Sequence, residues 1–274
     1  MKLLEIAQKQ IKKKQDIRLQ PYMYQTKEEI QQWMKDNHIE GFVNRELEIE
    51  PSTSSVHLGL YGSSNHFIDV NGEQRLPVQF KLAPNFDGGY EQTNSLIGYP
   101  YVVLGDCRIY NANLKTLEGC PQLVSGILEI RLADAHLQNF NGFAEHCKQL
   151  RLYNVSDHPS IIESIEGISD EIEELEIGCS YTNIAELYKY CKRLKHLWII
   201  TSPEKEADKN KKYNFLQIFK FKNIESFAVG LQTGSSSNDV KASQIINKHL
   251  QNDKDMLECQ EELITNGLSL YARV

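Results

Sequence analysis

The clearest pattern in the chain is a short strand that recurs through its middle. Six apolar-x-apolar triplets show the alternation of strands with one buried face. They begin at Cys107, Leu128, Leu150, Leu175, Leu197 and Phe227, in steps of 21, 22, 25, 22 and 30 residues. One strand with its return segment is too small to bury its own apolar face, so parallel units must stack on a shared core. We therefore predict an α/β fold, a leucine-rich-repeat-like solenoid with a parallel sheet of short strands.

A second motif recurs between these strands. The six residues from Ser95 to Pro100 return in similar form from Thr116 to Pro121, and weaker copies begin at Asn139 and Ser164. Self-similarity at a fixed period is the signature of repeat architectures. The repeated part of the chain is therefore predicted to run from 95 to 232.

The flanking segments do not follow this period. Residues 1–45 predict an N-terminal helical segment with a helix that begins at a capping box, Thr26 to Glu29, and ends near Asn37. Residues 46–94 predict an irregular β-rich N-cap region, and residues 233–274 predict a C-terminal cap. In that cap we expect two helices, over 240–250 and 253–264, and a final strand from Leu268 to Val274 that closes the solenoid. The polar stretch from 201 to 213 predicts a solvated insertion.

The order of these features resembles a group of degenerate leucine-rich-repeat proteins of tailed bacteriophages, with relatives in some bacteria. The resemblance covers roughly residues 26 to 170. It rests on the Thr26 helix, the Asp69-Val70-Asn71-Gly72 turn, the Leu76-Pro77-Val78-Gln79-Phe80 segment and the repeats at Leu96 and Leu117. It implies the solenoid fold and a phage origin, and no reaction. The chain departs from the usual leucine-rich repeat because no Asn follows its strands; those positions hold Ala112, Ala133, Val155, Ser180 and Ser202.

Charge, hydrophobicity and cysteine spacing limit the classes of partner and cofactor that we expect. The 274 residues carry a formal net charge of -7, which gives no reason to expect a nucleic acid. No apolar run is long enough to span a membrane, and the N-terminus lacks the apolar core of a secretion signal. The spacing of the six cysteines fits no zinc pattern and indicates reduced thiols. We therefore expect a cytoplasmic protein without cofactor, metal or membrane partner.

Outward-facing strand positions are the candidate binding surface. A residue between two buried ones points away from the core. Stacked in register, these residues form one row of Arg108, Glu129, Arg151, Glu176, Trp198 and Ala228, and a second row of Tyr110, Arg131, Tyr153, Gly178, Ile200 and Gly230. Because Tyr, Trp and Arg most often anchor interfaces, we predict a concave partner-binding face of Arg108, Tyr110, Arg131, Arg151, Tyr153 and Trp198. The alternative, equally weighted, is a surface whose charges neutralise each other.

Catalytic patterns are missing from the sequence. It contains no phosphate-binding loop, no GxSxG and no HExxH. Ser156, Asp157 and His158 are adjacent on one segment and point to different sides. His136, His146 and Cys147 lack a fourth metal ligand at suitable spacing. The acidic run from Glu163 to Glu176 is interpreted as a solvated edge of one repeat.

These observations favour a non-catalytic protein–protein interaction module, made by a phage to engage a host or phage protein during infection. The first alternative is a structural component of a virion or of an assembly scaffold. The second is an enzyme whose site is built from dispersed residues, since catalytic groups meet in space rather than in sequence.

Overall fold

A computed structural model gives the fold of the chain. It describes residues 3, 5–9, 24, 26–39, 41–46, 48–49, 56–57, 67–88, 93–133, 135–154, 160–178, 181, 183–201, 214–231, 238–252 and 254–273. Several sequence-based expectations lie outside these residues: the insertion after Thr201, the Ser156–His158 segment, Cys179, and the post-strand positions Val155, Ser180 and Ser202.

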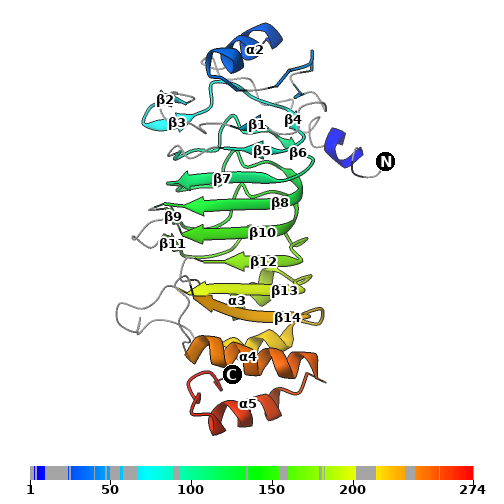
Figure 1. Cartoon of the computed structure of the whole chain (residues 1–274), viewed down its shortest axis with the longest axis vertical. Coiled ribbons are helices and arrows are strands. Elements are labelled where there is room, and N and C mark those ends of the chain that lie inside the picture. The colour runs from blue at the N-terminus through cyan, green and yellow to red at the C-terminus, as the bar shows by residue number, and fades with distance from the viewer. Residues whose placement is uncertain are drawn as a thin grey trace.

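The central feature is a stack of parallel strands that form one face of a solenoid (Figure 1). The order of the strands along the sheet follows the order of the chain. From one end to the other they are β1 Val56–His57, β5 Phe86–Asp87, β7 Cys107–Ala112, β8 Leu123–Leu132, β10 His146–Asn154, β12 Glu174–Ile177, β13 His196–Thr201 and β14 Ser226–Leu231. All six predicted triplets lie in these strands, so the prediction of a parallel solenoid is confirmed.

The stacking of strands begins earlier than the recognised repeats. β1 and β5 precede residue 95; β1 pairs in parallel with β5, and β5 pairs in parallel with β7. β4 (Leu82–Ala83) pairs with β6 (Val102–Val103), which also joins β8. These strands are only two residues long, too short to produce an alternating pattern in the sequence. A separate parallel pair, β9 (His136–Leu137) with β11 (Ile161–Ile162), lies in the return segments.

The repeated glycine has a precise structural role. In the copy at Leu117, the amide of Cys120 donates to the Leu117 carbonyl at 3.0 Å, and Gly119 between them has φ +89°. This is the geometry of a type II turn, which requires a residue that tolerates positive φ. A Cβ on Gly119 would lie 2.5 Å from the backbone carbonyl of Leu96 in the preceding turn. Glycine therefore lets successive turns stack in backbone contact.

Side-chain oxygens replace the missing asparagine ladder at a different place. The Asn85 side chain accepts from the amide of Asp106 at 2.8 Å. The Asp106 carboxylate accepts in turn from the amide of Ile127 at 3.0 Å. These three residues are 21 apart: Asn85 and Asp106 directly precede β5 and β7, and Ile127 lies within β8, whereas the usual ladder follows the strands. Adjacent turns are thus joined by side chains as well as by the sheet.

The N-terminal end is covered by α2 (Lys27–Asp36). Its predicted capping box is present, because the Thr26 hydroxyl accepts from the Glu29 amide and the Glu29 carboxylate accepts from the Thr26 amide. The buried face of the helix, Ile30, Trp33 and Met34, packs on the solenoid core. The predicted helix end near Asn37 is also confirmed.

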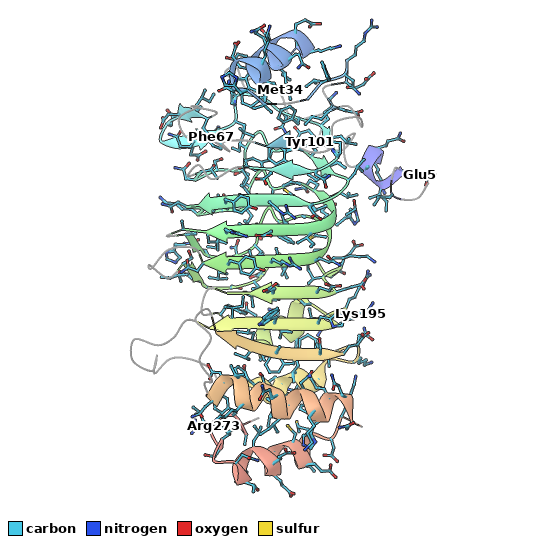
Figure 2. All side chains as sticks on the ribbon, in the orientation of Figure 1. Glu5, Met34, Phe67, Tyr101, Lys195 and Arg273 are labelled. Carbon is cyan, nitrogen blue, oxygen red and sulfur yellow. The ribbon has the colours of Figure 1, made fainter. Side chains whose placement is uncertain are left out.

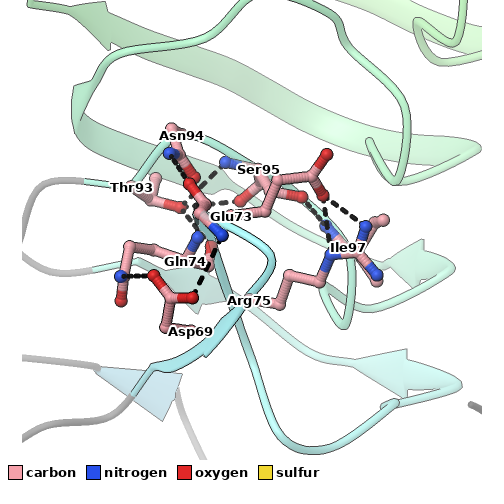
Figure 3. A network of polar contacts seen from close by, with 9 residues as sticks. Asp69, Glu73, Gln74, Arg75, Thr93, Asn94, Ser95 and Ile97 are labelled. Carbon is pink, nitrogen blue, oxygen red and sulfur yellow. Dashed lines mark hydrogen bonds and ion pairs between the residues drawn. The ribbon is translucent and has the colours of Figure 1, made fainter.

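A hairpin beside this cap is fastened to the first turn of repeats (Figure 3). β2 (Ile68–Val70) and β3 (Glu73–Arg75) are joined by Asn71 and Gly72, both with positive φ, as a two-residue hairpin turn requires. The Asn94 side chain accepts from the Gln74 amide at 2.7 Å and donates to the Gly72 carbonyl at 2.8 Å. One asparagine therefore fixes the hairpin against the repeats.

Helices appear where the repeat becomes longer. α3 (Ile184–Tyr190) and the 3₁₀ helix η1 (Phe215–Lys220) form return segments that the sequence analysis did not identify as helical. At the C-terminal end, the two predicted helices are present as α4 (Asn238–Gln251) and α5 (Met256–Thr265). None of the helices that the structure describes has the length and apolar character of a membrane span.

The edge strand β14 is closed by side chains of α4. The Ser243 hydroxyl accepts from the Val229 amide at 3.1 Å, and the Asn247 side chain accepts from the Phe227 amide at 3.0 Å. Unpaired amides on an edge strand are a template for aggregation, so α4 both covers and satisfies this edge.

The predicted final strand is wrong. Residues 268–273 form turns, in which the Tyr271 amide donates to the Leu268 carbonyl at 2.9 Å. The Leu268-x-Leu270 triplet imitates the repeat, but Leu268 is buried and Leu270 is exposed. The consecutive residues Tyr271 and Ala272 are both buried, which is incompatible with the alternation of a strand.

Candidate binding face

The outer face, defined as the outward-pointing side chains of β7 to β14, has the predicted register. Strand pairing places the first row in the order Arg108, Glu129, Arg151, Glu176, Trp198, Ala228. In the second row, Arg131 is opposite Tyr153, and Ile200 is opposite Gly230. Tyr110 lies where the register between β7 and β8 shifts, and its ring still contacts the Arg131 guanidinium. Side chains project from this face along the whole sheet (Figure 2).

Arg131 is the centre of the N-terminal half of the face. Its guanidinium lies 4.7 Å from the ring centroid of Tyr110 and 5.9 Å from that of Tyr153. Its Nε donates to Glu129 at 2.7 Å, and the Glu129 side chain is buried. Arg108 completes the cluster with its Nε 4.0 Å from the second Glu129 oxygen. A buried carboxylate is tolerable only when cations satisfy it, so these contacts hold the cluster rigid.

Arg151 and Tyr153 share one carboxylate. The Nε of Arg151 lies 3.4 Å from Glu176. Burial, followed by a hydrogen bond to Glu176, raises the pKa of the Tyr153 hydroxyl. The first four members of the first row therefore pair across strands, as sheet chemistry favours. Over this half of the face, the alternative of a surface that satisfies itself describes the contacts well.

Trp198 is different because its neighbours do not cover it. Its side chain is 48% exposed, whereas Tyr110 in the same face is buried. The indole packs over Gly230, where an added Cβ would lie 2.6 Å from its Nε1. Small residues on β14, Ser226 and Ala228, leave a groove beside the ring with a volume of about 230 Å³.

The groove crosses four strands, from β10 to β14. Its polar lining consists of Gln149, Arg151, Glu174, Glu176, His196 and Ser226. Gln149, Glu174, His196 and Ser226 form a third row, two residues before the first. The sequence analysis did not single out these residues, although their shared spacing from the first row was available as a signal.

The acidic run is engaged rather than simply solvated. Five of its seven carboxylates contact side chains of neighbouring turns: Glu163 with His136, Glu171 with His146, Glu173 with Lys148 and Lys195, Glu174 with Gln149, and Glu176 with Arg151. Hydrogen bonds from Lys195 and then Lys148 lower the pKa of Glu173 to about 2. The interpretation as a solvated edge holds for Glu163 and Glu174, which are exposed. It does not describe Glu171, Glu173 and Glu176, which are half-buried and paired because stacked turns bring cations within reach of them.

The histidine and cysteine candidates do not converge. His136 and His146 each pair with a different glutamate, and within the described part of the chain no three His, Cys, Asp or Glu side chains form a metal-binding group. The described cysteines are free and buried. Burial raises the pKa of Cys147 and Cys191 to about 12 each, which disfavours the reactive thiolate.

Comparison of the chain with protein-family models, with curated proteins and with solved structures finds no match. The class that fold and face define is thus a parallel β-solenoid with a polar and aromatic outer face.

Proposed function

We propose that this protein is a non-catalytic module that binds another protein through the outer face of its solenoid. The observation that carries the proposal is Trp198, a large aromatic ring left 48% exposed beside a groove. Tryptophan, with tyrosine and arginine, is the residue type that most often dominates the energy of an interface. Binding sites are typically concave and lined by aromatic side chains together with a few polar groups, as the groove beside Trp198 is.

The rest of the face supports this use because it is already ordered. Arg131 is held between two tyrosine rings and by Glu129. Side chains that are fixed before binding lose little conformational entropy when a partner arrives. The six residues predicted as the binding face thus contribute in two ways: Trp198 offers uncovered area, and Arg108, Tyr110, Arg131, Arg151 and Tyr153 offer a rigid polar surround.

We also propose that the solenoid is of the leucine-rich-repeat type and of phage origin, and that it acts on a host or phage protein in the cytoplasm of the infected cell. Two observations support this lineage. The motifs from Thr26 to the repeats occur in the order of the degenerate phage repeat proteins, and the turn glycines recur at 98, 119, 142 and 167. Steps of 21, 23 and 25 residues between them lie in the range of leucine-rich repeats.

The test is affinity capture with tagged wild type, Trp198→Ala and Ile161→Ala. Ile161 is the matched control, since it is equally exposed and lies on β11, outside the main sheet. We expect a protein retained from host or infected-cell lysate, bound again after purification, lost with Trp198→Ala and kept with Ile161→Ala. Circular dichroism checks that both variants fold.

Two outcomes would overturn the proposal. A partner that binds wild type and Trp198→Ala equally uses another surface. Stoichiometric presence of the protein in purified virus particles, with no retained partner, replaces the module by a structural component.

A further inference from the structure

The N-terminal half of the outer face shows which chemical group this sheet holds against its aromatic rings. Arg131 stacks on Tyr110 and Tyr153 while its Nε donates to Glu129. A guanidinium gains from both partners at once, through the ring quadrupole and through the charge of the carboxylate. The combination of glutamate and aromatic ring on adjacent strands is therefore a built arginine site, occupied by the chain itself.

The same combination recurs at the groove without an arginine of its own on the ring. Glu174 is opposite His196, two residues before Trp198, just as Glu129 is opposite Arg151, two residues before Tyr153. Within the described residues, cations lie over Tyr110, Tyr153, Tyr188 and Tyr190, and none lies over Trp198. Tryptophan is the best of the aromatic rings for a cation, so the stronger site is the open one.

The charges around the groove favour a cation. Glu174 and Glu176 line the groove. Glu225 lies at its border, 3.7 Å from the Nε2 of the lining residue His196. Arg151 is the groove's one lining cation, and its Nε is engaged with Glu176.

The nearby ammonium of Lys195 does not offset this excess, because it lies 2.6 Å from Glu173. Glu174 has only the neutral amide of Gln149 as a hydrogen-bond partner among the described side chains. The lining therefore holds one guanidinium and two carboxylates, with Glu225 at its border, so the groove is net negative.

We infer that the groove beside Trp198 binds an arginine side chain of the partner protein, stacked on the indole and paired with Glu174. The inference rests on the proposed function and names the chemistry of the partner's anchor. Ala228 and Ser226 supply the necessary room, since larger residues on β14 would fill the space beside the ring. A planar guanidinium fits a flat ring and a carboxylate better than an ammonium does.

The probe is a tetra-arginine peptide, and the matched ligand is the same peptide with citrulline, which keeps the shape and removes the charge. Binding is followed by calorimetry and by tryptophan fluorescence at low salt. The other tryptophan, Trp33, lies on the buried face of α2, so Trp198 reports the contact. We expect saturable binding of the arginine peptide, weakened by salt, and binding of the citrulline peptide about two- to fivefold weaker, the value of one exposed cation–π contact.

Three variants locate the site. Trp198→Leu should abolish the fluorescence change and weaken binding about two- to fivefold. Glu174→Gln should weaken it about threefold. Glu258→Gln is the control, an equally charged change at an exposed position on α5, and should bind as wild type does.

The outcomes separate this inference from the proposed function. Equal binding of the arginine and citrulline peptides, or equal loss in Glu174→Gln and Glu258→Gln, overturns the arginine site. If the partner protein is still lost with Trp198→Ala in that case, the module stands with a different anchor. If the peptide binds as expected and no partner depends on Trp198, the proposed function falls and with it the physiological meaning of the site.

Discussion

Replacing Gly119 by alanine tests whether the repeated glycine is what allows the turns to stack. Gly119 has φ +89°, and a Cβ at this position would lie 2.5 Å from the backbone of Leu96. The conformation alone costs an alanine about 1 to 2 kcal/mol. The overlap is with backbone rather than with a flexible side chain, so the preceding turn must shift, at about 1 to 3 kcal/mol more. We expect the free energy of unfolding to fall by about 2 to 5 kcal/mol.

The chain provides two controls for the conformational part of this cost. Gly72 and Gly267 have φ +84° and +73°, and an added Cβ at either would meet nothing within 4 Å. Gly72→Ala and Gly267→Ala should therefore lose only about 1 to 2 kcal/mol each. Urea unfolding followed by circular dichroism, with local hydrogen exchange at each site, measures the three losses.

The comparison has one decisive result. If Gly119→Ala loses no more than Gly72→Ala and Gly267→Ala, close stacking of successive turns is not the reason for the repeated glycine. The backbone conformation of the type II turn would then be sufficient to explain it. Gly142, whose Cβ would lie 2.8 Å from the backbone of the preceding turn, should repeat the behaviour of Gly119.

Three further predictions concern the edge, the acidic run and the thiols. The double variant Ser243→Ala/Asn247→Ala leaves two β14 amides unsatisfied and should cost about 2 to 4 kcal/mol, with self-association visible by light scattering; a monomer of wild-type stability would contradict the capping role. Because the folded pKa of Glu173 is about 2, below its ordinary 4.5, its contribution is present above pH 4.5 and is lost as pH falls towards 2. The melting-temperature deficit of Glu173→Gln should therefore shrink over that window, and a constant deficit would refute the ion-pair account. Cys147 and Cys191 should resist a maleimide at pH 7.5 until the chain unfolds, as peptide mass spectrometry can show; rapid labelling would mean that the turns open locally.

Local chemistry made several elements predictable. The Thr26 capping box and the Asn71-Gly72 turn are each set by residues within one turn of chain. The register of the outer face was predictable for a related reason, since a strand with alternate buried residues fixes which side chains point outward.

Elements that depend on distant contacts were not predictable in this way. The two-residue strand β5 pairs with β7 and in turn offers β1 a partner, and the residues of both short strands carry no pattern of their own. α3 has a local signal that passed unnoticed: the Asn183 side chain accepts from the amide of Glu186, an N-cap three residues before an acidic residue. The false strand at Leu268 arose from the opposite error, a local pattern without a strand to pair with.

The candidate binding face likewise has features that the local pattern predicts and features that depend on distant contacts. The two rows that contain Arg131 and Trp198 could be predicted from spacing, but the sequence did not show that Arg131 is stacked and Trp198 is uncovered. Whether an arginine is free or already stacked depends on side-chain contacts across three strands. The groove itself arises from small residues on β14, and small residues produce no hydrophobic period.

Charge pairing between neighbouring strands of the outer face stops at Trp198. We therefore expect a partner to bind there. From Arg108 to Glu176 each charge is matched by a neighbouring strand, which the stability of a parallel sheet explains. Pairing of this kind does not account for Trp198, which is uncharged and 48% exposed although it packs over Gly230. A repeat protein gains a specific surface by departing from its repeat at a few positions, and on this face the departure is an uncovered indole among carboxylates. The first row alternates positive and negative charges from Arg108 to Glu176, and the next position holds Trp198 instead of a cation. A ligand that places a positive charge on the indole would continue this alternation.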